Sequence, residues 1–300
     1  MPGIETVVRE DVVLAPYTTF RIGGPARYFA EPGSLDEFSA CIRWALERGI
    51  QFFLLGTGAN ILVADSGYSG FVIHTGRLDR IEVKGTTLTA ECGTALDRLV
   101  DSSLEFSLTG LEFAAGLPGT LGGALFMNAK AFGGCFADVV HSVKTLSVES
   151  GTLQESVLEH RELEYSYKQS FFQRRTHFIQ QARLTLSRGR QEAIRSLVEE
   201  NRSARLARGH YLYPNAGSIF KNDYSVGKPA GQLIDETGLK GTRIGDAEVY
   251  TRHGNFIINR GKATARDVYR LIRLVRKKVA EATGITLEME IILTGDWKET

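Results

Sequence analysis

The sequence is short of cysteine and has no surplus of charge of either sign. Its three cysteines, Cys41, Cys92 and Cys135, lie far apart and form no C-x-x-C pair, so they predict neither a disulfide framework nor a thiolate metal site. Buried, reduced thiols are expected instead, as in a cytoplasmic protein. The 36 basic and 35 acidic side chains nearly cancel, which disfavours nucleic acid and anionic membranes as partners. We therefore expect a small molecule as the partner, and we expect the protein to be a monomer.

The sequence also lacks a long apolar run without helix-breaking residues. The stretch that comes closest, 113–129, is uncharged but contains four glycines and a proline. In a helix interior glycine costs about 1 kcal/mol and proline about 3 kcal/mol, and a membrane span needs about 20 apolar residues. Near the N-terminus, Glu5, Arg9 and Glu10 interrupt any stretch long enough for a signal peptide. We expect neither a membrane span nor a signal peptide.

Length and local patterns predict more than one compact unit. Three hundred residues exceed a single small core. Local patterns predict a helix at 35–48, strands at 51–55 and 176–186, a hairpin at 71–92 around Lys84-Gly85, and a hairpin at 143–156 around Ser150-Gly151. The charged helical segment at 187–209 is the best candidate for a domain junction. Its arginines are interpreted as a solvated helix face, with a phosphate-binding face as the alternative.

The last hundred residues predict a separate α+β unit. Thr264 is a suitable N-cap for an amphipathic helix that Gly284 would end. The strand 285–293 follows, and its alternation places Glu288 and Glu290 on one face.

Two glycine-rich loops are the first candidates for a binding site. The segment LGTGANILV at 55–63 follows a predicted strand, and its glycines would let backbone N–H groups approach an anion, although a tight turn explains them equally well. The segment AGLPGTLGGALFMNAKAFGG at 115–134 has a proline-stiffened turn, Thr120 and the pair Gly122-Gly123 before a short apolar helix. Close packing of a helix on a sheet is the alternative here. Two such loops indicate a large, dinucleotide-like cofactor.

Several blocks, in order and nearly end to end, resemble one family. They are YTTFRIGGPARYF at 17–29, LGTGANILV at 55–63, GLEFAAGLPGTLGGALFMNAKAFGG at 110–134, YPNAGSIFKN at 213–222, AGQLIDETGLKGTRIGDAEVYTRHGNFIINRGKATARDV at 230–268 and LEMEI at 287–291. The family is that of UDP-N-acetylenolpyruvoylglucosamine reductase (MurB). No single block carries the resemblance, but their order and spacing are specific.

The resemblance implies an α+β protein with two parts. The first, 1–190, would be an FAD-binding domain of the vanillyl-alcohol-oxidase (PCMH) type, with subdomains of about 1–65 and 66–190. The second, 191–300, would be an α+β substrate-binding domain whose last strand returns to the first subdomain. FAD would be the cofactor and NADPH the co-substrate, and UDP-N-acetylglucosamine enolpyruvate would be reduced to UDP-N-acetylmuramate for peptidoglycan synthesis. Only fifty residues separate Lys168 from Ser218, which resembles the type II form without an extra tyrosine-bearing loop.

The resemblance also implies which residues would hold the cofactor. They are Gly56, Thr57, Gly58, Ala59, Asn60 and Ile61 in the first loop, and Gly116, Pro118, Gly119, Thr120, Gly122, Gly123 and Ala124 in the second. At Thr57, Ala59 and Lys130 the chain departs from the family's usual residues. These changes keep the backbone donors and leave side-chain contacts to FAD open.

Three residues would carry the reaction according to the resemblance. Ser218 matches the family's proton donor, with a turn serine as the alternative. Glu290 matches the catalytic glutamate on motif position alone, because spacing does not separate it from Glu288. Lys168 stands where the family has arginine; it keeps the charge but not the planar fork that grips a carboxylate, so Arg174 and Arg175 are possible substitutes.

The remaining implied residues face the substrate. They are Tyr167, Arg208 and Asn222, of which Arg208 equally fits a solvated helix. The six histidines form no metal-binding pattern, so we expect no metal and interpret His253 as structural. Two other functions stay open: a flavin-binding paralogue without turnover, and an oxidase of the same fold that uses oxygen.

Overall fold

The computed structural model describes residues 8–149 and 151–297, which form two compact units. Among these residues, the first unit contains Val8, Arg9, Phe29–Thr57 and the described part of Phe71–Arg205. The second contains Glu10–Tyr28, Gly58–Gly70 and residues 206–297. The chain therefore leaves the first unit for the last time near the end of the charged helix α4 (Gln191–Ala207), rather than before it. The binding-domain boundaries implied by the resemblance stay a prediction.

The N-terminal elements follow their local signals. Helix α1 (Leu35–Glu47) begins where the Ser34 side chain accepts a hydrogen bond from the Glu37 N–H, and it buries Phe38, Cys41 and Ile42. Strand β3 (Phe52–Leu55) follows, which confirms the predicted helix and strand. A four-stranded sheet has the order β1-β2-β5-β3, with β1 at Arg9–Val13, β2 at Pro25–Ala30 and β5 at Tyr68–His74.

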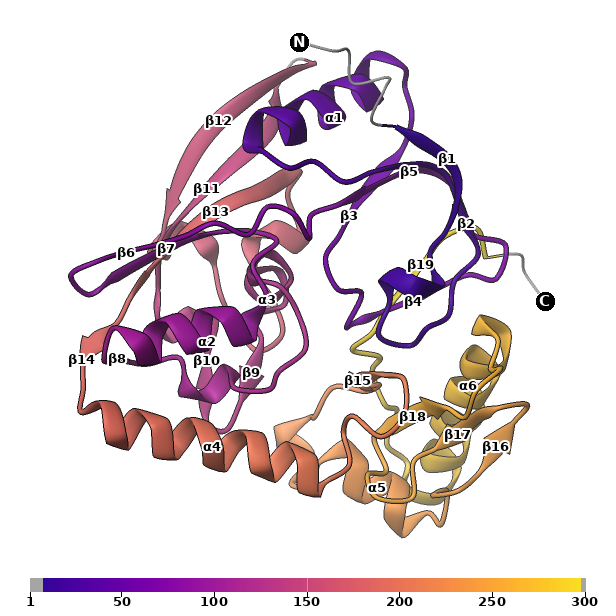
Figure 1. Ribbon diagram of the computed structural model, residues 1–300. Coiled ribbons are helices and arrows are strands. Elements are labelled where there is room, and N and C mark those ends of the chain that lie inside the picture. Colours follow the sequence, from indigo (N-terminus) through magenta and orange to yellow (C-terminus); the bar gives the residue numbers. More distant parts are fainter. Residues whose placement is uncertain (1–7, 150, 298–300) are drawn as a thin grey trace. The chain divides into compact units, whose positions relative to one another are not determined.

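A five-stranded antiparallel sheet forms the centre of the first unit. Its order is β12-β11-β13-β7-β6, with bounds Thr152–Glu159, Val140–Glu149, His177–Thr185, Thr87–Glu91 and Ile81–Lys84. Both predicted hairpins are confirmed, and Gly85 takes the positive φ of +65° that the first turn needs. Ser150 of the second turn lies outside the described residues. Helix α3 (Leu121–Met127) packs against β7 and β13 (Figure 1).

Shorter elements complete the first unit. They are α2 (Leu96–Glu105), β8 (Leu108–Thr109), β9 (Lys130–Ala131), β10 (Gly134–Cys135) and β14 (Ser187–Arg188), with single 3₁₀ turns at Glu112–Ala114, Phe136–Asp138, His160–Leu163 and Phe171–Gln173. Strands β8 and β14 pair with each other, as do β9 and β10.

The second unit is built around a four-stranded antiparallel sheet and helix α6 (Ala265–Thr283). The sheet order is β15-β18-β17-β16, with bounds Asn215–Ser218, Phe256–Asn259, Ala247–Val249 and Arg243–Ile244, and α5 spans Ala230–Glu236. Thr264 and Asp267 form a capping box at the start of α6, and Gly284 ends it at φ +73°. The predicted helix and both of its end signals are confirmed.

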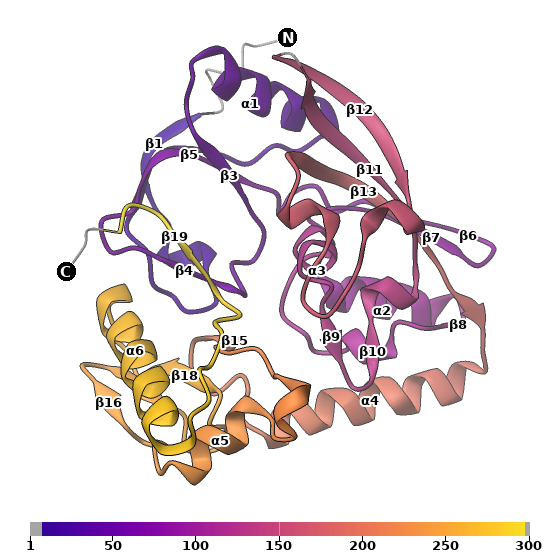
Figure 2. The ribbon, with the colours of Figure 1, turned by 180° about the vertical axis from the view of Figure 1, so that it is seen from behind.

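The C-terminal segment differs from the predicted strand at 285–293. It forms one antiparallel β-bridge at Met289 and then strand β19 (Ile292–Thr294), which runs parallel to β4 (Ile61–Val63) (Figure 2). The prediction of one continuous strand is therefore wrong. The segment divides its hydrogen bonds between two partners, so it bends between Met289 and Ile292 instead of alternating throughout.

The cysteines agree with the predicted reduced state. Cys41 and Cys92 are free and buried, and burial raises the pKa of each thiol to about 12. Cys135 is also free, but it is only half-buried. No helix within residues 8–149 and 151–297 is both long and apolar enough to cross a membrane.

Candidate functional site

The two glycine-rich loops lie against each other. The first begins at Gly56, directly after β3, and a Cβ atom on Gly56 would lie 2.5 Å from Thr120 Oγ1 in the second loop. That distance is too short for a carbon–oxygen contact, so only glycine allows the approach. The neighbouring Thr57 Oγ1 is buried and has no hydrogen-bond partner in the described part of the chain. Gly56 and Thr120 are separated by 63 residues, and the sequence did not predict this contact.

The two glycines of the pair in the second loop have different roles, one in packing and one at an exposed edge. Gly122 donates its N–H to the Cys92 carbonyl at 2.7 Å, and a Cβ on Gly122 would lie 3.0 Å from Cys92 Cβ. Gly122 therefore serves the close packing of α3 on the sheet. Gly123 is exposed, and its N–H donates to the N-cap side chain of Thr120 at 3.4 Å. Pro118 is exposed as well, so a ligand can reach this edge of the loop.

Charged side chains that the sequence did not single out hold the second loop in place. Asp97 Oδ1, on α2, accepts the Gly116 N–H at 2.9 Å, and the same oxygen accepts from Arg202 on α4 at 2.9 Å. Arg202 also donates to Asp101 at 2.7 Å. Partial burial lowers the pKa of Arg202, but the carboxylates of Asp101 and Asp97 outweigh it and raise the pKa overall. These residues lie on two helices far apart in the sequence, so their spacing did not predict the network.

The turn that carries Tyr167 and Lys168 is fixed to the end of α3. Lys168 adopts the left-handed region at φ +58°, and both residues are half-buried. Gln173 Nε2 donates to the carbonyls of Lys168 at 3.1 Å and Phe126 at 2.8 Å. Of the two possible substitutes for Lys168, Arg174 forms an ion pair with Glu164 at 2.7 Å. The other, Arg175, is exposed.

In the second unit, the serine segment and the glutamate segment run side by side. Ser218 ends β15, where it pairs with Phe256 of β18, and it is half-buried. Phe220 and Met289 form the antiparallel bridge, and the Glu290 N–H donates to the Ile219 carbonyl at 2.8 Å. Residues that are far apart in the sequence, Ser218 and Glu290, are therefore carried by neighbouring backbone segments.

The two candidate glutamates have different surroundings. Glu288 has a side chain that is 73 % exposed, and it forms an ion pair with Lys221 Nζ at 2.6 Å. Glu290 is half-buried. Asn60, from the first glycine loop, donates its side-chain N–H to the Glu290 carbonyl at 3.1 Å. The alternation in the sequence did not distinguish these residues, whereas burial does.

The other predicted residues are placed as follows. Asn222 Oδ1 accepts the Ala230 N–H at 3.0 Å and so caps α5, and Arg208 is exposed. His253 packs its ring against Phe256 with 4.4 Å between the ring centroids. Burial, and then the charge of Arg208, lower the pKa of His253, as expected for a neutral structural histidine.

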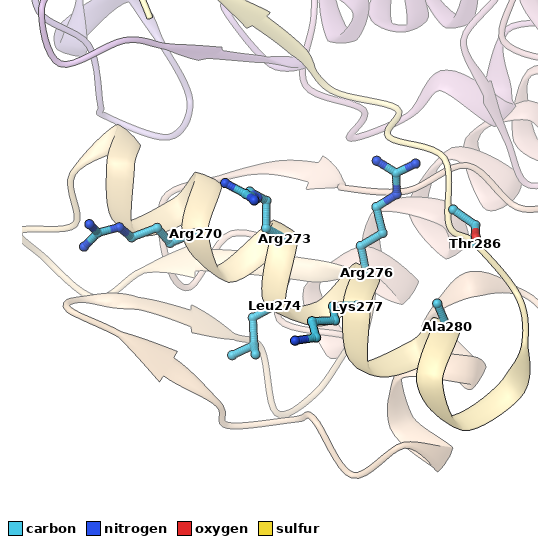
Figure 3. Close-up of a pocket in the computed structure, with 7 residues that line it drawn as sticks. All are labelled: Arg270, Arg273, Leu274, Arg276, Lys277, Ala280 and Thr286. Carbon is cyan, nitrogen blue, oxygen red and sulfur yellow. The ribbon is translucent and has the colours of Figure 1, made fainter. Parts of the chain in front are cut away.

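A hollow of about 560 Å³ lies along the outer face of α6, and none of the predicted site residues lines it (Figure 3). Its lining residues are Arg270, Arg273, Leu274, Arg276, Lys277, Ala280 and Thr286. The three arginines are exposed, so the hollow is the space between long cationic side chains on a helix face. Within the described residues, no group of three or more His, Cys, Asp or Glu side chains is placed to hold a metal ion.

Comparisons with known proteins match most of the chain. A family model described as "FAD binding domain" matches residues 26–156, and one described as "UDP-N-acetylenolpyruvoylglucosamine reductase, C-terminal domain" matches residues 209–294. UDP-N-acetylenolpyruvoylglucosamine reductases from Caldanaerobacter subterraneus and Borrelia garinii are 41 % and 40 % identical, over 93 % and 94 % of this chain and 91 % and 92 % of their own. The crystal structure of the MurB reductase from Thermus caldophilus has a TM-score of 0.80 at 35 % identity and covers 95 % of this chain and 99 % of its own.

These comparisons confirm the α+β fold with an FAD-binding domain, and they confirm FAD as the cofactor. The loops suit such a cofactor, because Gly56 lets the first loop lie directly against Thr120 of the second and the Gly123 edge is exposed. The structure brings the two loops together in this way and, in the second unit, brings Ser218, Glu290 and Asn60 together. The individual cofactor contacts and catalytic roles stay predictions.

Proposed function

Because the chain belongs to the UDP-N-acetylenolpyruvoylglucosamine reductase family, we propose that it reduces UDP-N-acetylglucosamine enolpyruvate to UDP-N-acetylmuramate, with NADPH as the hydride source. It is an FAD-dependent oxidoreductase. The observation that best supports the proposed reaction is the hydrogen bond from the Glu290 N–H to Ile219, which sets the glutamate segment beside the serine segment. The product is a peptidoglycan precursor, so we place the enzyme in the cytoplasm. We expect it to act as a monomer.

When bound, FAD would supply hydride transfer from the nicotinamide to the enolpyruvyl double bond. For holding it we propose the loop residues implied by the sequence. Gly123 would contribute through the backbone, because its surface is exposed, and Gly56 would contribute by letting the first loop close against Thr120. Gly122 would act indirectly, because its packing against Cys92 sets the position of the loop.

Ser218 is the proposed proton donor. Addition of hydride at C3 of the enolpyruvyl group leaves negative charge at C2 and in the carboxylate, so the site has to deliver a proton to C2. The serine Oγ–H is a weak acid, but an enolate carbon is a strong base. Its place at the end of β15, paired with Phe256, fixes the backbone from which the hydroxyl reaches out.

Glu290 is proposed to act in its protonated form. An ionised carboxylate beside C2 would repel the charge that develops there, whereas a carboxyl O–H would donate a hydrogen bond to it. Glu290 is half-buried, whereas Glu288 is exposed and its carboxylate is bound to Lys221. This difference supports Glu290 over Glu288.

Lys168 is proposed to attract the substrate carboxylate as a point charge. It carries a charge on a flexible stem and cannot make the planar, bidentate contact of an arginine, so we expect weaker orientation of the carboxylate than an arginine would give. Arg174 is a poorer candidate because Glu164 already neutralises it. Lys168→Ala with unchanged turnover and unchanged substrate affinity would remove this assignment.

Anaerobic stopped-flow absorbance tests the whole reaction. NADPH should bleach the oxidised flavin spectrum of the purified holoenzyme, and UDP-N-acetylglucosamine enolpyruvate, added afterwards, should restore it. Bleaching that only oxygen reverses would contradict the proposal and favour an oxidase. Bound flavin that neither NADPH nor the substrate affects would favour a binding paralogue.

A further inference from the structure

Two strands of the second unit begin at the same edge with a site residue just before each. Strand β4 (Ile61–Val63) starts directly after Asn60, and its parallel partner β19 (Ile292–Thr294) starts shortly after Glu290, with Ile292 opposite Ile61. The end of the first glycine loop and the glutamate segment therefore meet at one place, although 230 positions separate Asn60 from Glu290.

Asn60 makes two hydrogen bonds across this edge. Its side-chain Nδ2 donates to the Glu290 carbonyl at 3.1 Å, and its backbone carbonyl accepts the Ile292 N–H at 2.9 Å. Any residue at position 60 could supply the carbonyl. The side-chain donor is specific, because aspartate has the same shape without a donor and alanine has no polar group.

Glu290 is consequently fixed on both sides of its own Cα. The Glu290 N–H is held by the Ile219 carbonyl of the serine segment, at 2.8 Å, and its carbonyl is held by Asn60. The chain crosses from the serine segment to β4 between Met289 and Ile292, so these two bonds lie at the bend itself. A bend with few strand hydrogen bonds is a place where the backbone would otherwise move.

We propose that Asn60 is a positioning residue for Glu290: its carboxamide holds the Glu290 carbonyl and so sets the direction in which the Glu290 carboxyl group points. The inference rests on the catalytic role proposed above for Glu290. It gives Asn60 a task beyond the cofactor contact implied by the loop, namely to link the order of the glycine loop to the placement of the acid.

The test separates the two halves of the reaction in the holoenzyme. Asn60→Ala and Asn60→Asp are compared with the parent as FAD-saturated holoenzymes, and their reduction by NADPH should slow at least about tenfold less than the second half-reaction. Return of the oxidised spectrum with substrate should slow by about 10² in Asn60→Ala, since a misplacement of about 1 Å costs that much. The matched control is Gln191→Ala, because Gln191 Nε2 donates to the Leu104 carbonyl over the same 3.1 Å on a different part of the chain. It should leave both halves unchanged.

Two further measurements distinguish positioning from a general loss of structure. In a Glu290→Gln background, Asn60→Ala should slow the second half-reaction by less than a further threefold, because the two changes act through one group. In Asn60→Asp, the introduced carboxyl group can donate to the Glu290 carbonyl only when protonated. Its second half-reaction should therefore recover toward the parent rate as the pH falls, while that of Asn60→Ala should not.

Hydrogen exchange keeps the outcome independent of the proposed function. In Asn60→Ala the amides of 287–294 should exchange at least about tenfold faster than in the parent. Unchanged exchange would refute the proposal that Asn60 holds the Glu290 backbone. Loss of FAD or of reduction by NADPH would show that Asn60 serves the cofactor instead. If Glu290→Gln alone left the second half-reaction unchanged, the proposed catalytic role of Glu290 would be wrong. The hydrogen bond from Asn60 could then still slow exchange of the 287–294 amides, but it would have no catalytic role.

Discussion

Replacing Gly56 by alanine should weaken FAD binding because the new methyl group has no room between the two glycine loops. The Cβ would lie 2.5 Å from Thr120 Oγ1 and 3.1 Å from Thr120 Cγ2, so either loop must shift. Such overpacking costs about 1–3 kcal/mol. If Thr120 moves away, it also loses its capping bond to the Gly123 N–H, which is worth about 1 kcal/mol.

We expect the apoprotein to lose about 2–3 kcal/mol of unfolding free energy and the FAD dissociation constant to rise at least about tenfold, since each factor of ten corresponds to about 1.4 kcal/mol. Urea unfolding of the apoprotein and fluorescence titration with FAD measure the two effects separately. Thr120→Ala removes the oxygen that Gly56→Ala would strike. The double variant should therefore bind FAD more tightly than the two single losses would predict together.

Gly49→Ala is the control for a glycine replaced in open space. Gly49 follows α1 with φ +63° and has no atom within 4 Å of its would-be Cβ, so its replacement should cost about 1 kcal/mol of backbone strain and leave FAD affinity unchanged. If Gly56→Ala bound FAD as tightly as the parent and unfolded at the same urea concentration, the contact between the loops would be wrong.

Three further outcomes follow from the site. Arg202→Ala removes the ion pairs with Asp97 and Asp101, which support the second loop. It should lower the unfolding free energy in urea by about 1 kcal/mol and weaken FAD binding measured by titration. An unchanged FAD affinity would show that the loop does not need this support. Glu290→Gln should slow the substrate-dependent return of the oxidised flavin spectrum by at least about 10². Glu288→Gln loses only an exposed contact to Lys221 and should change this rate by less than about twofold. Equal effects would refute the different roles of the two glutamates. Burial lowers the folded-state pKa of His253 below 6.5, so the unfolded chain protonates this histidine more readily than the folded chain does. The contribution of His253 to stability is therefore complete above pH 6.5 and is lost as the pH falls through the folded-state pKa. This loss should be smaller in His253→Asn, as urea unfolding between pH 8 and 5 would measure.

The sequence predicted those elements whose signals are local. Thr264 and Gly284 mark the two ends of α6, and Gly85 marks the turn of the first hairpin, because caps and tight turns depend on neighbouring residues alone. The strand 285–293 was predicted from an alternation that holds only while a segment has one partner. Which partner it takes depends on residues more than sixty positions away, so the bend at Glu290 has no local signal.

The candidate site shows the same limit. Glycine spacing located both loops, yet the contact between Gly56 and Thr120 follows from the way the strands fold back, and so does the different task of Gly122 and Gly123. Motif position pointed to Glu290, but the property that distinguishes it from Glu288 is burial, which alternation along a strand does not encode. The bracing pair Asp97 and Arg202 belongs to two helices about a hundred residues apart and is visible only in three dimensions.

The pairing of β4 with β19 has a consequence for biosynthesis. The far end of the first glycine loop, at Asn60, is braced by Ile292 and Glu290, and 230 positions separate Asn60 from Glu290. During translation these two residues are made long after the loop, so its far end stays incomplete until they emerge, and closing so long a stretch of chain is entropically costly. A chain that stops shortly before Glu290 would carry every loop residue implied to contact FAD and still lack the strand that holds the end of the first loop. Nor can the second unit be cut out as one continuous fragment, because Phe71–Arg205 of the first unit separates β4 from the later part of the second unit in the sequence.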